Sequence, residues 1–311
     1  MAVDERMALI LLYHGVTDAL SRGIENFSGK HITAEAFDRQ MAYLHANASV
    51  FSLRDLATLV EAGAEIPPNA VAVTFDDGYR NNYDFALSIL KSHGIPATFF
   101  LSTGLIGTDR QFWTDKVEHW INLTCRVSLD LVLDGEPFQC DLRETDQRIE
   151  AVIRIKSKLK SISPSERDDA LSELNRYCEV DDDGKDVSNY QSMSWDQVRD
   201  LDSSPDYEVG GHTVNHEIMA YLDDAALERE IYDCIATVET ELGHECDLFS
   251  YPEGQAEHYD GRTIAHLREA GVSICPSAID GTNGPGTDPF QLRRVMVGFM
   301  GEPFPMAVSV A

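Results

Sequence analysis

The sequence predicts an α/β fold in which parallel strands alternate with crossover helices. Short apolar runs of strand length alternate with helical patterns along most of the 311 residues, an order that favours βα units. The run at 71–75 is rich in β-branched residues and the run at 96–102 is rich in Phe, as strands are. Gly94 and Gly271 each follow a helical pattern, where a glycine in the left-handed conformation commonly ends a helix.

The first third of the chain gives this pattern in order. Residues 7–13 form an apolar run that we expect to be the first strand. Thr33 is a suitable N-cap for the next helix, in which apolar residues recur three and four positions apart at Ala34, Phe37, Met41, Leu44 and Ala48. A strand at 71–75, a helix at 82–93 and a strand at 96–102 then complete a β-α-β-α order.

The alternation of strand and helix patterns stops between about residue 107 and residue 190. An alternating pattern over 128–138 contains Asp134-Gly135, which is a hairpin signal. A helical stripe follows at Ile149, Val152, Ile155, Leu159 and Ile162. Ser163 and Glu166 form a capping box around Pro164 that opens a second helix. We therefore expect residues 107–190 to be an insertion of a hairpin and helices within a single domain that spans residues 1–311.

The α/β pattern resumes at Ser194 and continues close to the end of the chain. We expect helices at 195–201, 224–242 and 262–270, and strands at 207–210, 247–251, 272–275 and 292–297. Because strands and helices alternate here as they do before residue 107, the insertion interrupts one α/β domain.

The charge of the chain excludes several classes of partner. Lys and Arg number 25 and Asp and Glu number 53, which gives a net charge of −28 with His neutral. Such a charge repels phosphate, so it argues against binding to nucleic acid and to anionic membrane surfaces. No apolar run reaches the ~18 residues of a membrane span. Residues 1–6 carry acids where a secretory leader would be basic, so we expect a cytoplasmic protein.

The cysteines point away from a disulfide scaffold and from a thiolate zinc site. The six of them are scattered and form no Cys-x-x-Cys pair. We expect reduced and mostly buried thiols.

Two adjacent carboxylates lie where a buried strand is predicted to end. Asp76 and Asp77 follow the strand at 71–75, and Gly78 allows the chain to turn sharply after them. Ligands bind at the carboxyl ends of strands in parallel α/β folds. Neighbouring carboxylates repel unless a cation neutralises them, so a metal on one Asp would leave the other as a general base. The alternative is an Asp-rich turn that caps the next helix.

A pair of histidines lies at the end of another predicted strand. His212 and His216 are four residues apart, which places both on one face of a helical turn and suits two ligands of one metal. Two surface histidines without a function would give the same spacing. Together with Asp77 they form a set of two histidines and one carboxylate, which favours zinc or another divalent transition metal.

Three other residues are candidates for catalysis. The loop at 249–254 could aim a backbone N–H near Glu253 at a developing oxyanion, although a plain β-turn has the same pattern. His14 follows the first strand and could protonate a leaving group, or it could be a hydrogen-bonded core histidine. Arg294 alternates with apolar residues, so an inward side chain would need a carboxylate partner and an outward one would have no role.

In this order the motifs resemble those of the polysaccharide deacetylase family, which shares the NodB homology domain. Thr74-Phe75-Asp76-Asp77-Gly78 matches the family's first motif, and residues 212–216 match its second. The resemblance covers about 7–108 and 194–297 and leaves the insertion outside. The Tyr-His-Gly sequence around His14 and the Leu-x-Arg-x-x-Val sequence around Arg294 resemble the biofilm-polysaccharide deacetylase branch.

The resemblance implies both a fold and a site. The fold would be an incomplete (β/α)7 barrel of the NodB type with an inserted hairpin-plus-helices segment. Zn²⁺ or another divalent transition metal would be held by Asp77, His212 and His216. Asp76 would be the general base.

The chain departs from the family's pattern in three places. Ser250 stands where the family has an Arg that pairs with the catalytic Asp, and Glu253 stands where it has an aromatic residue. The late Leu-x-His motif that supplies an acid has no match, because residues 272–278 contain no His. We expect Arg294 to pair with Asp76 instead, the backbone N–H of Glu253 to serve the oxyanion, and His14 to be the acid.

By this resemblance the chain is expected to be a metal-dependent carbohydrate N-deacetylase. It would remove the N-acetyl group from an N-acetylated amino sugar in a glycan or glycan precursor, with Asp76 taking a proton from the attacking water. Two alternatives stay open, namely a metal-dependent hydrolase of a non-sugar amide and a glycan-binding homologue without catalysis. Asp76 argues against the second, because a binding protein has no use for an unliganded carboxylate beside a metal. The sequence leaves open the sugar, the native metal, the role of the insertion and the oligomeric state.

Overall fold

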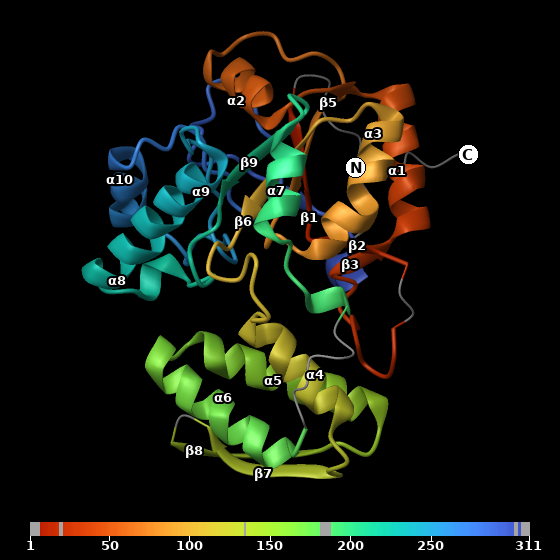
Figure 1. The fold of residues 1–311 in the computed structure, drawn as a ribbon, viewed down its shortest axis with the longest axis vertical. Coiled ribbons are helices and arrows are strands. Elements are labelled where there is room, and N and C mark those ends of the chain that lie inside the picture. Colours follow the sequence, from red (N-terminus) through yellow and green to blue (C-terminus); the bar gives the residue numbers. More distant parts are fainter. Residues whose placement is uncertain (1–6, 19–20, 134, 181–187, 302–303, 306–311) are drawn as a thin grey trace. The chain divides into compact units, whose positions relative to one another are not determined.

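The structure is a computed structural model that describes residues 7–18, 21–133, 135–180, 188–301 and 304–305. The chain divides into two compact units, which Figure 1 shows coloured along the sequence. The larger unit comprises Met1–Asp18, Ser28–Asp109 and Gln191–Ala311. The smaller unit comprises Ala19–Phe27 and Arg110–Tyr190.

Parallel strands form the centre of the larger unit (Figure 1). The strands pair in the order β10 (Val295–Met296), β1 (Leu9–Tyr13), β5 (Ala70–Phe75), β6 (Ala97–Leu101) and β9 (Tyr207–Gly211), with β4 (Ser49–Val50) beside β5. All of these pairings are parallel, and the register places Tyr13 opposite Phe75 and Leu101 opposite Gly211. The carboxyl ends of the strands therefore meet along one rim.

The row of strands continues beyond β9 and closes on itself. Residue 249 bridges residue 211, and residue 274 bridges residue 248, both in parallel. The N–H of Ser277 donates to the carbonyl of Leu292 (2.8 Å), and the N–H of Arg294 donates to the carbonyl of Ile279 (3.1 Å). Because β10 follows directly and pairs with β1, the segments form a ring, which is the incomplete barrel that the sequence predicts.

The closing segments are less regular than predicted. The strands expected at 247–251 and 272–275 are reduced to the single bridges, and the strand expected at 292–297 is reduced to β10. Pro252 and Pro276 directly follow two of these segments and have no backbone N–H that could extend the pairing.

Alternate residues of the strands pack on the two sides of the ring. Leu9, Leu11 and Tyr13 belong to the largest core cluster, together with the buried face of α1. A second cluster gathers residues from strands all around the ring, namely Ala8, Ile10, Ala72, Phe100, Leu248, Ile274 and Leu292. This second cluster fills the interior of the barrel, as the two-residue period of strands requires.

Helices flank the strands of the larger unit (Figure 1). α1 (Ala34–Asn47) starts at the predicted cap, where the side chain of Thr33 accepts a hydrogen bond from the N–H of Ala36 (3.2 Å). The other helices are α2 (Leu53–Glu61), α3 (Leu87–His93), α7 (Trp195–Asp202), α8 (Asp224–Glu228), α9 (Cys234–Leu242) and α10 (Gly261–Glu269). The short elements of this unit are the paired strands β2 (Gly15–Thr17) and β3 (His31–Thr33) and the 3-10 turns Met219–Tyr221 and Phe299–Gly301, and the 3-10 turn Ser188–Tyr190 belongs to the smaller unit.

Two of the predicted helices contain a π-helical segment. The helix expected at 82–93 consists of the π segment Asn82–Ala86 followed by α3. The helix expected at 224–242 consists of α8, the π segment Arg229–Asp233 and α9. A π turn inserts an extra residue into the helix and occurs frequently at functional sites.

The smaller unit is an antiparallel hairpin with three helices. β7 (Ser128–Leu133) pairs with β8 (Glu136–Asp141), and α4 (Trp113–Leu123), α5 (Thr145–Lys160) and α6 (Pro164–Cys178) share a core with it. The capping box of Ser163 and Glu166 is present as predicted. Asp134 of the predicted turn lies outside the described residues, and Gly135 has a φ of 70°. The helix α4 was not among the elements expected from the sequence.

Two further observations concern membranes and thiols. Within the described ranges, no helix has the length and apolar character needed to cross a bilayer. All six cysteines are free thiols, and those at 178, 234, 246 and 275 are buried.

Candidate metal centre

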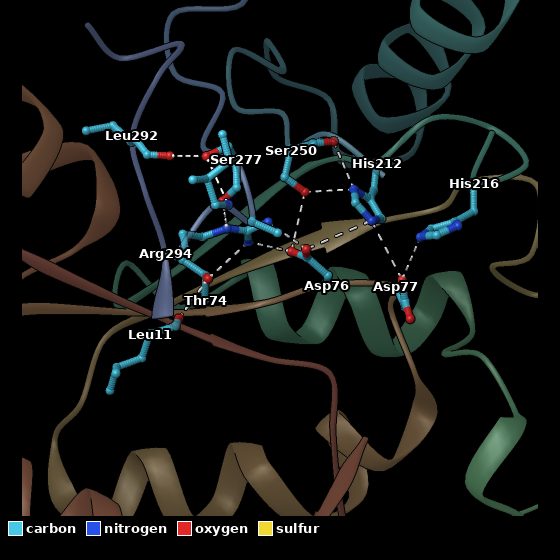
Figure 2. Close-up of polar contacts among 12 residues, drawn as sticks. Leu11, Thr74, Asp76, Asp77, His212, His216, Ser250, Ser277, Leu292 and Arg294 are labelled. Carbon is cyan, nitrogen blue, oxygen red and sulfur yellow. Dashed lines mark hydrogen bonds and ion pairs between the residues drawn. The ribbon is translucent and has the colours of Figure 1, made fainter. Parts of the chain in front are cut away.

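The two adjacent aspartates lie at the carboxyl end of β5. The N–H of Asp76 still donates to the carbonyl of Tyr13 (3.0 Å), so this residue continues the strand pairing. The chain then reverses through Asp77 (φ 78°) and Gly78 (φ 83°). A Cβ on Gly78 would lie 2.8 Å from the side chain of Ile106, so only glycine fits at this turn. The reversal points the two carboxylates in different directions (Figure 2).

His212 and His216 follow β9, but they do not lie on a helical turn as the spacing predicted. Residues 212–217 form a loop in which Thr213 (φ 61°) and His216 (φ 59°) adopt the left-handed conformation. The N–H of His212 donates to the carbonyl of Leu101 (2.9 Å), which keeps this residue next to β6. The loop then brings His216 back, so that the two ring centroids are 4.9 Å apart.

Asp77, His212 and His216 converge on one point (Figure 2). The Nε2 atoms of His212 and His216 lie 3.6 Å and 3.3 Å from Oδ1 of Asp77. One ligand atom from each residue lies within 4.8 Å of the others. Oδ1 of Asp77 is buried and has no hydrogen-bond partner among the described residues. A buried carboxylate oxygen in this position needs a cation to offset the loss of solvation.

The protonation states of the three groups suit a metal. Nδ1 of His212 lies 2.9 Å from the carbonyl oxygen of Ser250 and must donate to it, so the ring presents Nε2 to Asp77. Burial lowers the pKa of His216 to about 4, so its imidazole is neutral. Burial acts to raise the pKa of Asp77, but the charges of Lys30 and the nearby histidines together outweigh it, and the pKa lies below its usual value. One carboxylate and two imidazoles fit a divalent transition metal.

Asp76 forms a buried ion pair with Arg294. The two terminal nitrogens of Arg294 each donate to one oxygen of Asp76, both at 2.7 Å. Arg294 also donates from Nε to the carbonyl of Ser277 (2.7 Å) and from Nη1 to the hydroxyl of Thr74 (3.2 Å). Its side chain is 0% exposed, and it therefore points into the barrel. Burial acts to raise the pKa of Asp76, but the guanidinium holds it below its usual value.

Ser250 joins the two parts of the site. Its hydroxyl donates to Oδ1 of Asp76 (3.3 Å) and lies 2.7 Å from Nδ1 of His212. Figure 2 shows this hydroxyl between the Asp76–Arg294 pair and the imidazole of His212. The side chain that replaces the family's Arg therefore contacts both the candidate base and a candidate metal ligand.

His14 and Glu253 lie on neighbouring loops and act on the site electrostatically. The Nδ1 of His14 is buried, and within the described residues it has no hydrogen-bond partner. Burial lowers the pKa of His14, whereas the charges of Asp77 and Asp76 act to raise it. Glu253 (φ 59°) follows Pro252, and its charge acts to raise the pKa of His216. The N–H of Gly254 donates to the carbonyl of Pro252 (2.6 Å), so the loop is tightly turned.

Sequence reasoning missed two charged residues at the site. Nζ of Lys30 lies 3.6 Å from Oδ2 of Asp77 and donates to the hydroxyl of Tyr79. A single Lys in a loop carries no local signal, so its role could not be found. Glu230 is buried and binds the loop that carries the histidines. A signal existed for this residue, because Glu230 falls on the same helical stripe as Leu227 and Cys234.

Comparison with known protein sequences gives partial matches. A family model described as polysaccharide deacetylase matches residues 63–125 and 183–275. Over 136 residues the chain is 32% identical to a poly-β-1,6-N-acetyl-D-glucosamine N-deacetylase of Staphylococcus epidermidis, covering 41% of this chain and 44% of that protein. Over 117 residues it is 31% identical to the Staphylococcus aureus protein of the same name, covering 34% and 39%. The matched stretch therefore spans less than half the length of these relatives.

Comparison with solved structures extends over nearly the whole chain. IcaB from Ammonifex degensii is similar with a TM-score of 0.59 at 19% identity, covering 94% of this chain and 92% of that one. The deacetylase PplD of Streptococcus pyogenes, solved in complex with acetate, is similar with a TM-score of 0.60 at 14% identity, covering 94% and 93%. At these identities the similarity concerns the fold, and the predicted fold class is confirmed.

Proposed function

The chain belongs to the polysaccharide deacetylase family, and on that premise we propose that it is a metal-dependent N-deacetylase of an N-acetylated amino sugar in a glycan or glycan precursor. The observation that carries the proposal is the convergence of Asp77, His212 and His216 on one point, beside Asp76 in its pairing with Arg294. This arrangement holds a metal-ligand set and a separate ionised carboxylate side by side.

Each residue of the site has a part in the proposed reaction. A divalent cation bound by Asp77, His212 and His216 would polarise the acetyl carbonyl and acidify water. Asp76 accepts the proton of the water that attacks the carbonyl carbon, and Arg294 keeps it ionised for that purpose. Ser250 and Arg294 together fix the orientation of the carboxylate through hydrogen bonds.

The later steps need a donor for the oxyanion and an acid for the amine. The tight turn at 252–254 supports a backbone N–H near Glu253 as the oxyanion donor. His14 is the candidate acid, because the charges of Asp77 and Asp76 act on it. Burial has the larger effect and lowers its pKa, so a proton must reach His14 during the reaction before it can donate one. Proton transfer from His14 to the departing nitrogen, as the C–N bond breaks, gives the free amine and acetate.

The proposal also specifies the metal and the sugar. We propose Zn²⁺, because two imidazoles and one carboxylate form the ligand set of catalytic zinc sites that leave positions open for water and substrate. We propose a polymer of N-acetylglucosamine as the substrate, because the staphylococcal relatives carry that substrate in their names. A non-sugar amide is the competing substrate class.

The test measures acetate release from N-acetylglucosamine oligomers while zinc is titrated into metal-free protein. Wild type is expected to release acetate in proportion to bound zinc, and His212→Ala is expected to lose both binding and release. The matched control is His244→Ala, because His244 is partly exposed and pairs with Asp202 away from the ligand set. Zinc binding without acetate release would redirect the proposal to other amides, and wild type that binds no zinc would overturn it.

A further inference from the structure

The loop between the two histidines adopts a conformation that it cannot hold by itself. Thr213 and His216 both have positive φ, at 61° and 59°. Residues with a Cβ rarely adopt this conformation, and it persists only where the surroundings hold it in place. The residues between the histidines must therefore be anchored for His212 and His216 to point at one position.

A single carboxylate supplies much of this anchoring. Oε2 of Glu230 accepts hydrogen bonds from the N–H of Val214 (2.9 Å) and the N–H of Asn215 (2.8 Å). Its Oε1 accepts a third from the side-chain amide of Asn215 (2.7 Å). Both oxygens of Glu230 thus accept hydrogen bonds from two of the three residues between the histidines, Val214 and Asn215.

The opposite side of the loop is held by the neighbouring strand end. The N–H of Thr103 donates to the carbonyl of Thr213 (3.1 Å), and the N–H of Gly104 donates to the carbonyl of Val214 (2.8 Å). These bonds use the carbonyls of the loop, whereas Glu230 uses its N–H groups. Without the carboxylate, the N–H groups of Val214 and Asn215 would lose their acceptor, which favours rearrangement of the loop.

Glu230 reaches the loop from an unusual position in its helix. It lies in the π segment Arg229–Asp233, and its side chain is 8% exposed although it is charged. Its neighbours on the same stripe, Leu227 and Cys234, are buried in the apolar core. A carboxylate costs free energy at such a position unless it is hydrogen-bonded, so its place among apolar residues fits a role in holding the loop.

The π segment Asn82–Ala86 likewise holds another loop of the site through a hydrogen bond. Asn82 is the first residue of the segment Asn82–Ala86 and is fully buried. Its side-chain amide donates to the carbonyl of His14 (2.9 Å). Each π segment therefore places a buried polar side chain against the backbone of a loop that carries a candidate site residue.

We propose that Glu230 is the positioning residue for the histidine pair and sets the metal affinity of the site through the 213–216 loop. The inference rests on the proposed function, because it takes His212 and His216 to be metal ligands. Residues that hold metal ligands in place commonly change metal affinity about 10- to 100-fold when they are replaced.

The test compares the zinc affinity of metal-free variants, measured by competition with a chelator. Glu230→Ala is expected to bind zinc about 10- to 100-fold more weakly than wild type. Glu230→Gln is expected to lose less, because it keeps one acceptor oxygen for the backbone N–H groups. Glu228→Ala is the matched control, since Glu228 lies on the same helix but is exposed, and it is expected to bind zinc as wild type does.

The visible spectrum of bound Co²⁺ separates a positioning role from a general loss of stability. A displaced histidine changes the coordination of cobalt and hence the spectrum, whereas lower stability of a protein that is still folded leaves the spectrum unchanged. If folded Glu230→Ala binds zinc with wild-type affinity and gives the wild-type cobalt spectrum, the inference is wrong while the proposed function stands. If Glu230→Ala does not fold, Glu230→Gln decides by the same two readouts. Wild type that binds neither metal would overturn the proposed function and this inference together.

Discussion

Arg294 and Asp76 form a buried ion pair, so the stability of the protein is expected to depend on both partners being present. Arg294→Met would leave an ionised carboxylate in the barrel without its partner, which is expected to cost about 3–5 kcal/mol of unfolding free energy. Urea denaturation measures this loss. The variant is also expected to release acetate far more slowly than wild type, because Asp76 loses its orientation and its preference for the ionised form.

A double variant separates the two effects of Arg294. Asp76→Asn/Arg294→Met removes both charges and is expected to recover part of the lost stability without any recovery of acetate release. An Arg294→Met protein as stable and as active as wild type would show that the pair has no such role.

The site residues differ in how far the sequence could predict them. Asp76 and Asp77 stand in a motif with a distinctive order, and so do His212 and His216. Arg294 was predictable only from the absence of an Arg at position 250, combined with its place in an alternating segment. Lys30 reaches Asp77 from a loop far away in the sequence, so only the folded chain reveals it.

At the scale of single elements, the turn at 250–254 depends on a glycine that cannot be replaced. Gly254 has a φ of 57°, and a Cβ on it would lie 2.5 Å from the backbone nitrogen of Ala278. Gly254→Ala is expected to lower the thermal midpoint and to reduce acetate release, because the loop must move away from residue 278. Differential scanning fluorimetry and the acetate assay measure the two effects.

The control for this prediction is a glycine with the same strain and free space around it. Gly243 has a φ of 76°, and a Cβ on it would have no heavy atom within 4 Å. Gly243→Ala therefore pays only the conformational penalty, about 1–2 kcal/mol, and is expected to keep its activity. Equal losses in the two alanine variants would mean that the contact with Ala278 has no effect.

Helices and strands that local sequence patterns determine were predicted well. Those whose conformation depends on tertiary contacts were predicted poorly. The Thr33 cap and the strand β5 follow from local sequence, and the structure has both. The helical turn predicted for 212–216 is wrong, because the loop there has positive φ and donates backbone hydrogen bonds to Glu230. Periodicity also cannot show the π segments, because one extra residue barely disturbs an apolar stripe.

At the scale of the whole molecule, the net charge of −28 opposes folding through repulsion between carboxylates. Salt screens this repulsion between exposed charges but has little effect on the buried ion pair in the barrel. The thermal midpoint is therefore expected to rise when NaCl is increased from about 0.05 M to about 1 M. A midpoint that falls or stays constant would mean that surface repulsion has no net effect on stability.

The division into two units was only partly visible in the sequence. The break in the α/β rhythm marks the region from about 107 to 190, and the smaller unit includes Arg110–Tyr190. It also includes Ala19–Phe27, where Ile24 packs into the core of that unit. No local pattern links this short stretch to a segment about a hundred residues away, because the link is made by long-range packing alone.

Zinc binding and acetate release, measured together in wild type and Asp76→Asn, separate the role of the metal ligands from that of the base. In the proposed mechanism Asp77, His212 and His216 bind the metal, and Asp76 accepts the proton. Wild type is expected to bind one zinc ion and to release acetate from N-acetylglucosamine oligomers. Asp76→Asn is expected to bind zinc and to release almost no acetate. Acetate release by Asp76→Asn at the wild-type rate would contradict the account.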